Sequence, residues 1–168
     1  MEAVLTIGLA GSAAVVFGTF MEYVVHRLMH WGLLYGKGHL HHHETGDART
    51  MAKDLFDYGS GALLLGWPGF FVSTNVGIGW LGGAVVYAVL ASYAHQLQHA
   101  RAHLVFWLPR PIHAIHHALD QRDGNFGILV DWWDRLFGTY KPVEWPRPQG
   151  PEARLAGYLD IPWWHERP

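Results

Sequence analysis

The chain has 168 residues, enough for one domain, and 50% of them are hydrophobic while only 15% are charged. A formal net charge of -2 provides no broad basic surface, which argues against nucleic acid as a partner. There are 13 histidines and no cysteine, so disulfides, thiolate zinc sites and cysteine-ligated iron–sulfur clusters are excluded.

The first apolar segment runs from Ala3 to Met21 without a charged residue. About 20 such residues are needed to cross the hydrocarbon core of a bilayer, so we interpret this segment as a membrane helix. A cleaved signal peptide is the alternative. It is disfavoured because Glu2 stands where such peptides carry Lys or Arg, and because the apolar run continues into HRLMH rather than into a cleavage site.

The second apolar stretch, from Tyr58 to Ala94, also lacks charged residues and is long enough for two short crossings. We expect a helical hairpin whose turn falls between Ser73 and Gly77, where the residues tolerate turn geometry. Pro68 is expected to kink the first of the two helices. A buried hairpin of a soluble protein is the alternative, but a chain of this length has little protein to cover so much apolar surface.

Basic residues follow the first and the third of these crossings, and the positive-inside rule places both groups in the cytoplasm. They are Arg27, Lys37, Arg49 and Lys53, then Arg101, Arg110, Arg122 and Arg135. We therefore predict a single domain over residues 1–168, an all-α, integral-membrane helical bundle of about three to four transmembrane helices. Its N-terminus is external, a histidine-rich helical cap faces the cytoplasm, and the Pro-rich tail 142–168 packs over that cap as extended chain.

Ten of the histidines fall into four clusters just beyond the predicted crossings or in short cytoplasmic segments. They are His26 and His30; His39, His42 and His43; His95 and His99; and His113, His116 and His117. On a helix, residues at positions i, i+3 and i+4 share a face, so each cluster is able to direct its rings toward one centre. Isolated solvated histidines are the alternative, and we assign it to His41 and His165.

Ten neutral imidazoles suit a transition metal rather than calcium or magnesium, and they are too many for one ion. Two ions with four or five nitrogens each would use the whole set and leave open positions. Zinc would be well coordinated in such a site and is a possible substitute in purified protein. It has no redox chemistry, however, so on this interpretation activity requires two iron ions.

The sequence resembles the fatty acid hydroxylase and sterol desaturase superfamily, nearest the fatty acid hydroxylase branch. HRLMH, HLHHH and HAIHH look like its HxxxH, HxxHH and HxxHH boxes, HQLQH looks like the fourth box, and Asn125 to Tyr140 resembles the segment after the last box. The resemblance implies a di-iron centre held by the ten histidines, with no catalytic residue beyond these metal ligands. It also implies O₂ as co-substrate, a membrane lipid substrate and an external electron-donor protein of the ferredoxin or cytochrome type.

Four residues are candidates for supporting the ligands from behind: Asp120, Asp123, Asn125 and His103. The aspartates follow the last histidine cluster, where a carboxylate could accept a proton from the second ring nitrogen of a ligand. His103 continues the face of His95 and His99 by one further turn. A solvated turn is an equally good interpretation of the aspartates.

The predicted function is O₂-dependent hydroxylation or desaturation of a C–H bond in a lipid such as a fatty acyl chain. Oxidation of a sterol or carotenoid by the same chemistry is an alternative. A non-catalytic metal-binding or metal-transporting membrane protein is a second one, but it predicts ionisable residues inside the crossings, and the two uncharged stretches contain none. A membrane cytochrome with paired histidine ligands is a third, and it requires histidines within the bilayer rather than at its edge.

Overall fold

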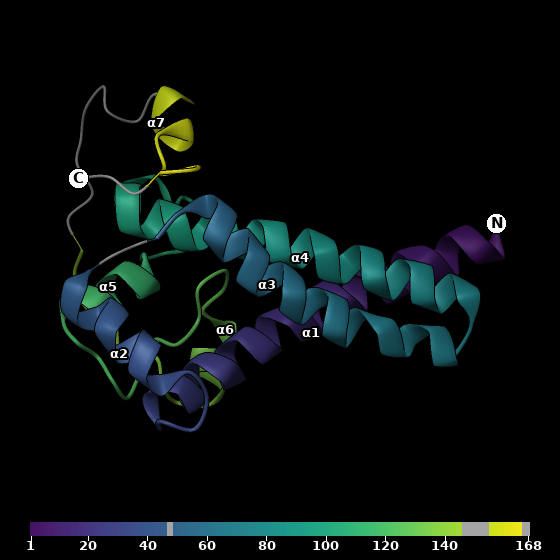
Figure 1. Cartoon of the computed structure of the whole chain (residues 1–168), viewed down its shortest axis with the longest axis horizontal. Coiled ribbons are helices and arrows are strands. Elements are labelled where there is room, and N and C mark those ends of the chain that lie inside the picture. The colour runs from purple at the N-terminus through teal and green to yellow at the C-terminus, as the bar shows by residue number, and fades with distance from the viewer. Residues whose placement is uncertain (47–48, 146–154, 166–168) are drawn as a thin grey trace.

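The computed structural model describes residues 1–46, 49–145 and 155–165, and the regular secondary structure of these residues consists of helices alone, as predicted. Three helices form the body of the molecule and lie side by side in Figure 1: α1 (Glu2–His30), α3 (Met51–Gly66) and α4 (Thr74–Arg101). α4 packs against both of the others. The smaller helices gather at the end away from the N-terminus; they are α2 (Gly36–Thr45), η2 (Ala102–Leu104), α5 (Ile112–Ala118), α6 (Trp132–Leu136) and α7 (Leu155–Leu159).

Two of the helices are long and apolar enough to cross a membrane, α1 and the continuous segment Thr74–Leu104. α3 is shorter and extends through the 3₁₀ helix η1 (Trp67–Phe71). Pro68 lies in the first turn of η1, so the proline marks the change from α to 3₁₀ winding rather than a kink within one α-helix. The predicted break between the two helices is present but lies earlier than expected: Ser73 caps α4 by accepting a hydrogen bond from the backbone N–H of Val76, so residues 74–77 form the first turn of α4 rather than a loop.

Glycines allow α1 and α4 to approach at their backbones, far from the histidines. A Cβ added at Gly83 would lie 2.8 Å from the Cα of Gly11, and one added at Gly79 would lie 2.9 Å from the Cα of Ile7. Close contact through small residues is the usual way in which helices associate in a bilayer, where hydrophobic burial gives little driving force. The crossing therefore fixes how the histidine-bearing ends of α1 and α4 meet.

The described part of the C-terminal tail packs against the histidine-bearing end of the molecule and contains the short helix α7, so it is not the extended chain that was predicted. Backbone N–H groups of Met51 and Ala52, at the start of α3, donate to the carbonyls of Pro162 and Trp163. Ile161 is buried in a small core with side chains from α3, α4, α5 and the η2 region. The parts of the predicted tail at 146–154 and 166–168 lie outside the described residues.

Candidate metal centre

The four histidine clusters come together at one end of the bundle. His26 and His30 occupy the last two turns of α1, and His95 and His99 occupy the same part of α4. The other two clusters lie on α2 and α5, which pack at these helix ends (Figure 1). The ligand nitrogens divide into two groups, within each of which they lie no more than 4.8 Å apart. Group one contains His26, His30, His39, His43 and His116, and group two contains His42, His99, His113 and His117.

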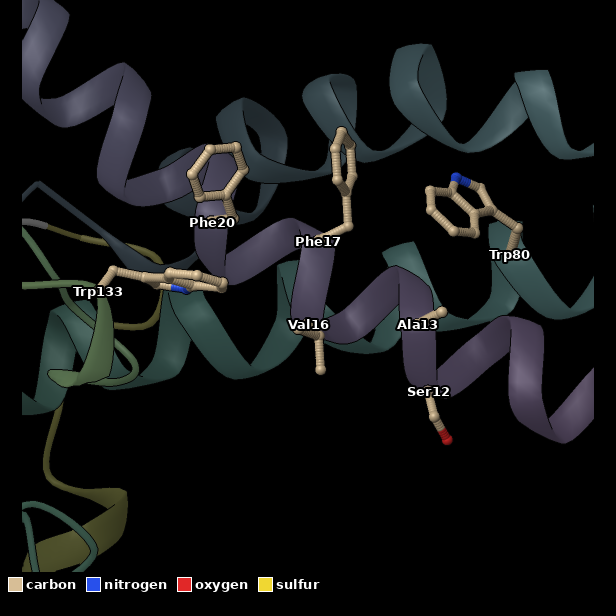
Figure 2. A pocket seen from close by; sticks show the side chains of 7 residues that line it. All are labelled: Ser12, Ala13, Val16, Phe17, Phe20, Trp80 and Trp133. Atoms are coloured by element: carbon tan, nitrogen blue, oxygen red, sulfur yellow. The ribbon is translucent and has the colours of Figure 1, made fainter. Parts of the chain in front are cut away.

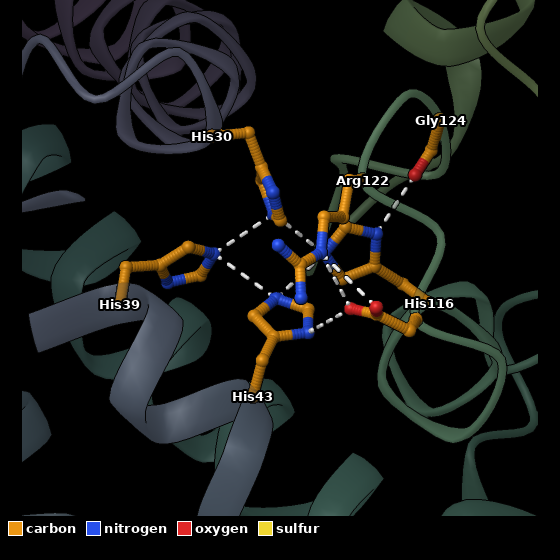
Figure 3. Close-up of polar contacts among 7 residues, drawn as sticks. His30, His39, His43, His116, Arg122 and Gly124 are labelled. Atoms are coloured by element: carbon orange, nitrogen blue, oxygen red, sulfur yellow. Dashed lines mark hydrogen bonds and ion pairs between the residues drawn. The ribbon is translucent and has the colours of Figure 1, made fainter. Parts of the chain in front are cut away.

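Four nitrogens of group one form a closed ring, in which the Nε2 atoms point toward one another (Figure 3). His30 Nε2 lies 2.9 Å from both His39 Nε2 and His116 Nε2. His43 Nε2 closes the ring at 3.2 Å from His39 and 3.1 Å from His116. A square with edges near 3.0 Å surrounds a point about 2.1 Å from each corner, which is the usual bond length from a transition metal to imidazole nitrogen. Group one therefore has the dimensions of a metal site.

Group two adjoins group one and repeats the convergence. His99 Nε2 lies 3.2 Å from His113 Nε2. The ring of His117 stacks on the ring of His43 with centroids 4.0 Å apart, so the two groups are immediate neighbours. Nine imidazoles thus surround two adjoining positions, and the donor set fits two borderline metal ions.

The structure corrects the expectation that each cluster serves one centre. His39 and His43 belong to group one, but His42 between them belongs to group two. On α5, His116 likewise belongs to group one, whereas His113 and His117 belong to group two. Adjacent residues project about 100° apart on a helix, so α2 and α5 lie between the two positions and present a ligand to each.

His95 is the one predicted ligand that lies outside both groups. Its ring is nevertheless close to group two, with its centroid 4.7 Å from that of His99 and 4.8 Å from that of His113. Its Nδ1 lies 2.5 Å from the carboxylate oxygen Oδ2 of Asp54 on α3. No local pattern in the sequence connects Asp54 with the histidines.

Burial keeps His43 and His116 neutral. Loss of solvation, with smaller contributions from neighbouring imidazoles, lowers the pKa of His43 to about 4. Loss of solvation also lowers the pKa of His116 to about 3, against a raising effect of its hydrogen bond to Gly124. A neutral imidazole is the form that binds a metal, so the environment favours the ligating state at neutral pH.

Backbone carbonyls orient two ligands of group one. His26 Nδ1 donates to the carbonyl of Phe126 at 2.6 Å, and His116 Nδ1 donates to the carbonyl of Gly124 at 2.8 Å. Because a carbonyl only accepts, the hydrogen of each ring stays on Nδ1 and the Nε2 lone pair faces the group. Within the described residues, His26 Nε2 is buried without a hydrogen-bond partner, as expected for an atom reserved for a metal.

Two buried carboxylates fix the loop that carries these carbonyls. Asp134 accepts hydrogen bonds from the backbone N–H groups of Phe126 and Gly127. Glu22, one helical turn before His26 on α1, accepts hydrogen bonds from Ile128 and Leu129. Sequence reasoning missed both acids. The signal for Glu22 was a single acid directly after an uncharged span, on the same helical face as His26.

The four predicted supporting residues have different outcomes. Asn125 lies between Gly124 and Phe126, whose carbonyls orient the ligands, and has a φ of 57°. Its side-chain amide makes two hydrogen bonds with the backbone of Lys141, which hold the loop in place. Asp120 is exposed, pairs with Arg122 and lies 3.8 Å from His43 Nδ1, beyond hydrogen-bond range. Asp123 is exposed and pairs with Lys141, and His103 on η2 lies outside both groups. His41 and His165 are exposed, as expected for solvated histidines.

Comparison with known proteins agrees with this arrangement. The sequence model of the fatty acid hydroxylase family matches residues 12–139, which include all ten clustered histidines and the loop that supports group one. The chain belongs to the fatty acid hydroxylase family. Searches of curated proteins and of solved structures gave no significant match. Membership in this family makes the chain an oxidoreductase, and together with the two apolar helices it indicates a membrane protein.

This member of the fatty acid hydroxylase family also has an apolar groove of about 530 Å³ along α1 (Figure 2). It is lined by Ser12, Ala13, Val16, Phe17, Phe20, Trp80 and Trp133. Trp80 closes one end against Phe17, with ring centroids 5.5 Å apart. At the end near the histidines, the ring centroids of Trp133, on α6, and Phe20 are 5.1 Å apart, and Trp133 Nε1 donates a hydrogen bond to the hydroxyl of Thr19. The groove thus extends from the apolar part of α1 to the helix that follows the supporting loop.

Proposed function

We propose that the chain is an O₂-dependent, di-iron membrane oxygenase that hydroxylates or desaturates a C–H bond in the acyl chain of a lipid. The observation that carries the proposal is the convergence of nine imidazoles on two adjoining positions. Two bound irons would supply the redox capacity to activate O₂ toward a C–H bond. The electrons would come from a separate donor protein of the ferredoxin or cytochrome type.

The residues of the chain have three roles in this proposal. The histidines of groups one and two would hold the metals with one ring nitrogen each, and for His26 and His116 this is Nε2 because Nδ1 is tied to a carbonyl. The supporting loop, fixed by Glu22 and Asp134, would keep these nitrogens in place during turnover. The cap, proposed to face the cytoplasm, would limit access of bulk water to the centre.

The groove along α1 supports a lipid substrate. Its lining is apolar apart from Ser12, and it lies on a helix that is suited to the bilayer. An acyl chain entering from the membrane would replace lipid contacts with protein contacts at little cost, and Trp133 would direct it toward the cap.

The proposal is tested with the full chain purified from membranes grown with iron. Metal analysis should give two irons per chain, and reduction followed by exposure to ¹⁸O₂ with acyl lipids should give a product with one ¹⁸O atom or with two fewer hydrogens. His43→Gln should abolish the product, whereas His41→Gln on the exposed face of α2 should leave it unchanged. One ion or none per chain, or two irons without any oxidised lipid, would refute the proposed function.

A further inference from the structure

A buried carboxylate on α3 contacts the end of α4 that carries histidines. Asp54 is 4% exposed, and its Oδ2 accepts hydrogen bonds from His95 Nδ1 at 2.5 Å and from Gln96 Nε2 at 2.6 Å. A buried carboxylate loses its hydration and is stable only when such donors replace it. α3 carries none of the ten clustered histidines, so this contact gives the helix a link to the candidate centre.

His95 lies beside group two and has one ring nitrogen that is not bonded to Asp54. The ring is 8% exposed and has three neighbours from group two, with centroid distances of 4.7 Å to His99, 4.8 Å to His113 and 5.5 Å to His42. Because Nδ1 is bonded to Asp54, Nε2 is the ring atom left to bind a ligand. His95 thus stands at the edge of group two with one nitrogen held by an anion.

We propose that Asp54 is a positioning residue that holds His95 as the fifth ligand of group two. The inference rests on the proposed function in so far as both require metal at this group. Each of the two metal positions would then have five imidazole ligands. The two ligand sets would differ in what holds Nδ1, because His26 and His116 of group one donate to neutral carbonyls whereas His95 donates to a carboxylate.

This difference has a chemical consequence. A carboxylate that accepts the Nδ1 hydrogen increases the electron density of the ring and makes Nε2 a stronger donor to a cation than a carbonyl does. Group two would therefore bind a divalent metal more tightly than group one. Removal of a residue that accepts the Nδ1 hydrogen of a metal-binding histidine typically lowers metal affinity by about 10- to 100-fold.

The alternative is that Asp54 and His95 form a structural ion pair that only holds α3 against α4. Titration of the metal-free full chain in detergent with Co²⁺ alone separates the two, because the visible absorption of Co²⁺ reports its coordination number. The native chain should show two classes of site. Asp54→Asn, which retains the volume but removes the charge, should weaken the tighter class by about 10- to 100-fold and change its spectrum. A structural pair predicts a lower unfolding temperature with both classes unchanged, and that result would overturn the inference.

Asp57→Asn is the matched control, because Asp57 lies one turn along α3, is half-exposed and pairs with Arg49 rather than with a histidine. It should leave both classes unchanged. His95→Gln removes the proposed ligand itself and should weaken the tighter class at least as much as Asp54→Asn, and the double variant should lose no more than His95→Gln alone, because Asp54 acts through His95. Independent losses in the double variant would contradict this.

A second substitution at Asp54 covers the case in which the first one prevents folding. If Asp54→Asn does not fold, Asp54→Glu, which keeps the charge, should retain both classes while His95→Gln loses the tighter one. Unchanged binding in His95→Gln would then refute the inference. Because cobalt binding is measured without turnover, two bound irons that oxidise no lipid would end the proposed function and leave this inference standing.

Discussion

Gly83→Ala tests whether the close crossing of α1 and α4 determines stability. The new methyl carbon would lie 2.8 Å from Gly11 Cα and closer still to the Gly11 carbonyl oxygen, whereas carbon atoms normally approach no closer than about 3.5 Å. The obstacle is backbone, which cannot rotate away as a side chain can, so the two helices must separate by about 1 Å. Overpacking of this kind costs about 1–3 kcal/mol.

Gly82→Ala is the control, because a Cβ at Gly82 meets no atom within 4 Å. Both substitutions gain the same helix propensity, up to about 1 kcal/mol, so their difference isolates the crossing. Reversible unfolding in mixed micelles, followed by circular dichroism, should find Gly83→Ala less stable than Gly82→Ala by about 1–3 kcal/mol. Equal stability of the two variants would show that the backbones are not in contact at this point.

Two other predictions concern the cap. Asp134→Asn should destabilise the protein by about 1–3 kcal/mol and weaken metal binding at group one, because an amide N–H₂ would face the buried N–H of Phe126 or Gly127. Calorimetry and metal titration check this prediction, with Asp131→Asn as the control because Asp131 pairs with Arg135 instead. The metal-free protein should lose stability as the pH falls from about 6.5 toward 4. The unfolded chain binds protons below the ordinary histidine pKa of 6.5, while folded His43 and His116 do so only near 4 and 3. An unfolding midpoint that stays constant between pH 7 and 4.5 would contradict that reasoning.

Much of the architecture could be predicted from local patterns in the sequence. The uncharged stretches identified the apolar helices, and the turn-forming residues near Ser73 located the break before α4 to within a few residues. Helical spacing identified all nine histidines that converge. These features depend on composition and on the period of the helix, which are properties of neighbouring residues.

The division of the histidines could not be predicted in the same way. Whether His42 joins His43 or His99 depends on where α2 lies between α1 and α4, and no local pattern encodes that position. The roles of Asp54, Glu22 and Asp134 were missed for a similar reason, since each binds a segment distant in the sequence. The predicted aspartates, in contrast, were close to the histidines in sequence but point to solvent.

The placement of α2 and α5 between the two positions couples the geometry of the two groups. His42 and His43 are joined by one peptide bond, yet each faces a different cation position. A rotation of α2 that moved His43 within group one would also move His42 within group two, so the spacing of one set of nitrogens depends on that of the other. An ion bound at either group would therefore restrict the movement of the ligands of its neighbour.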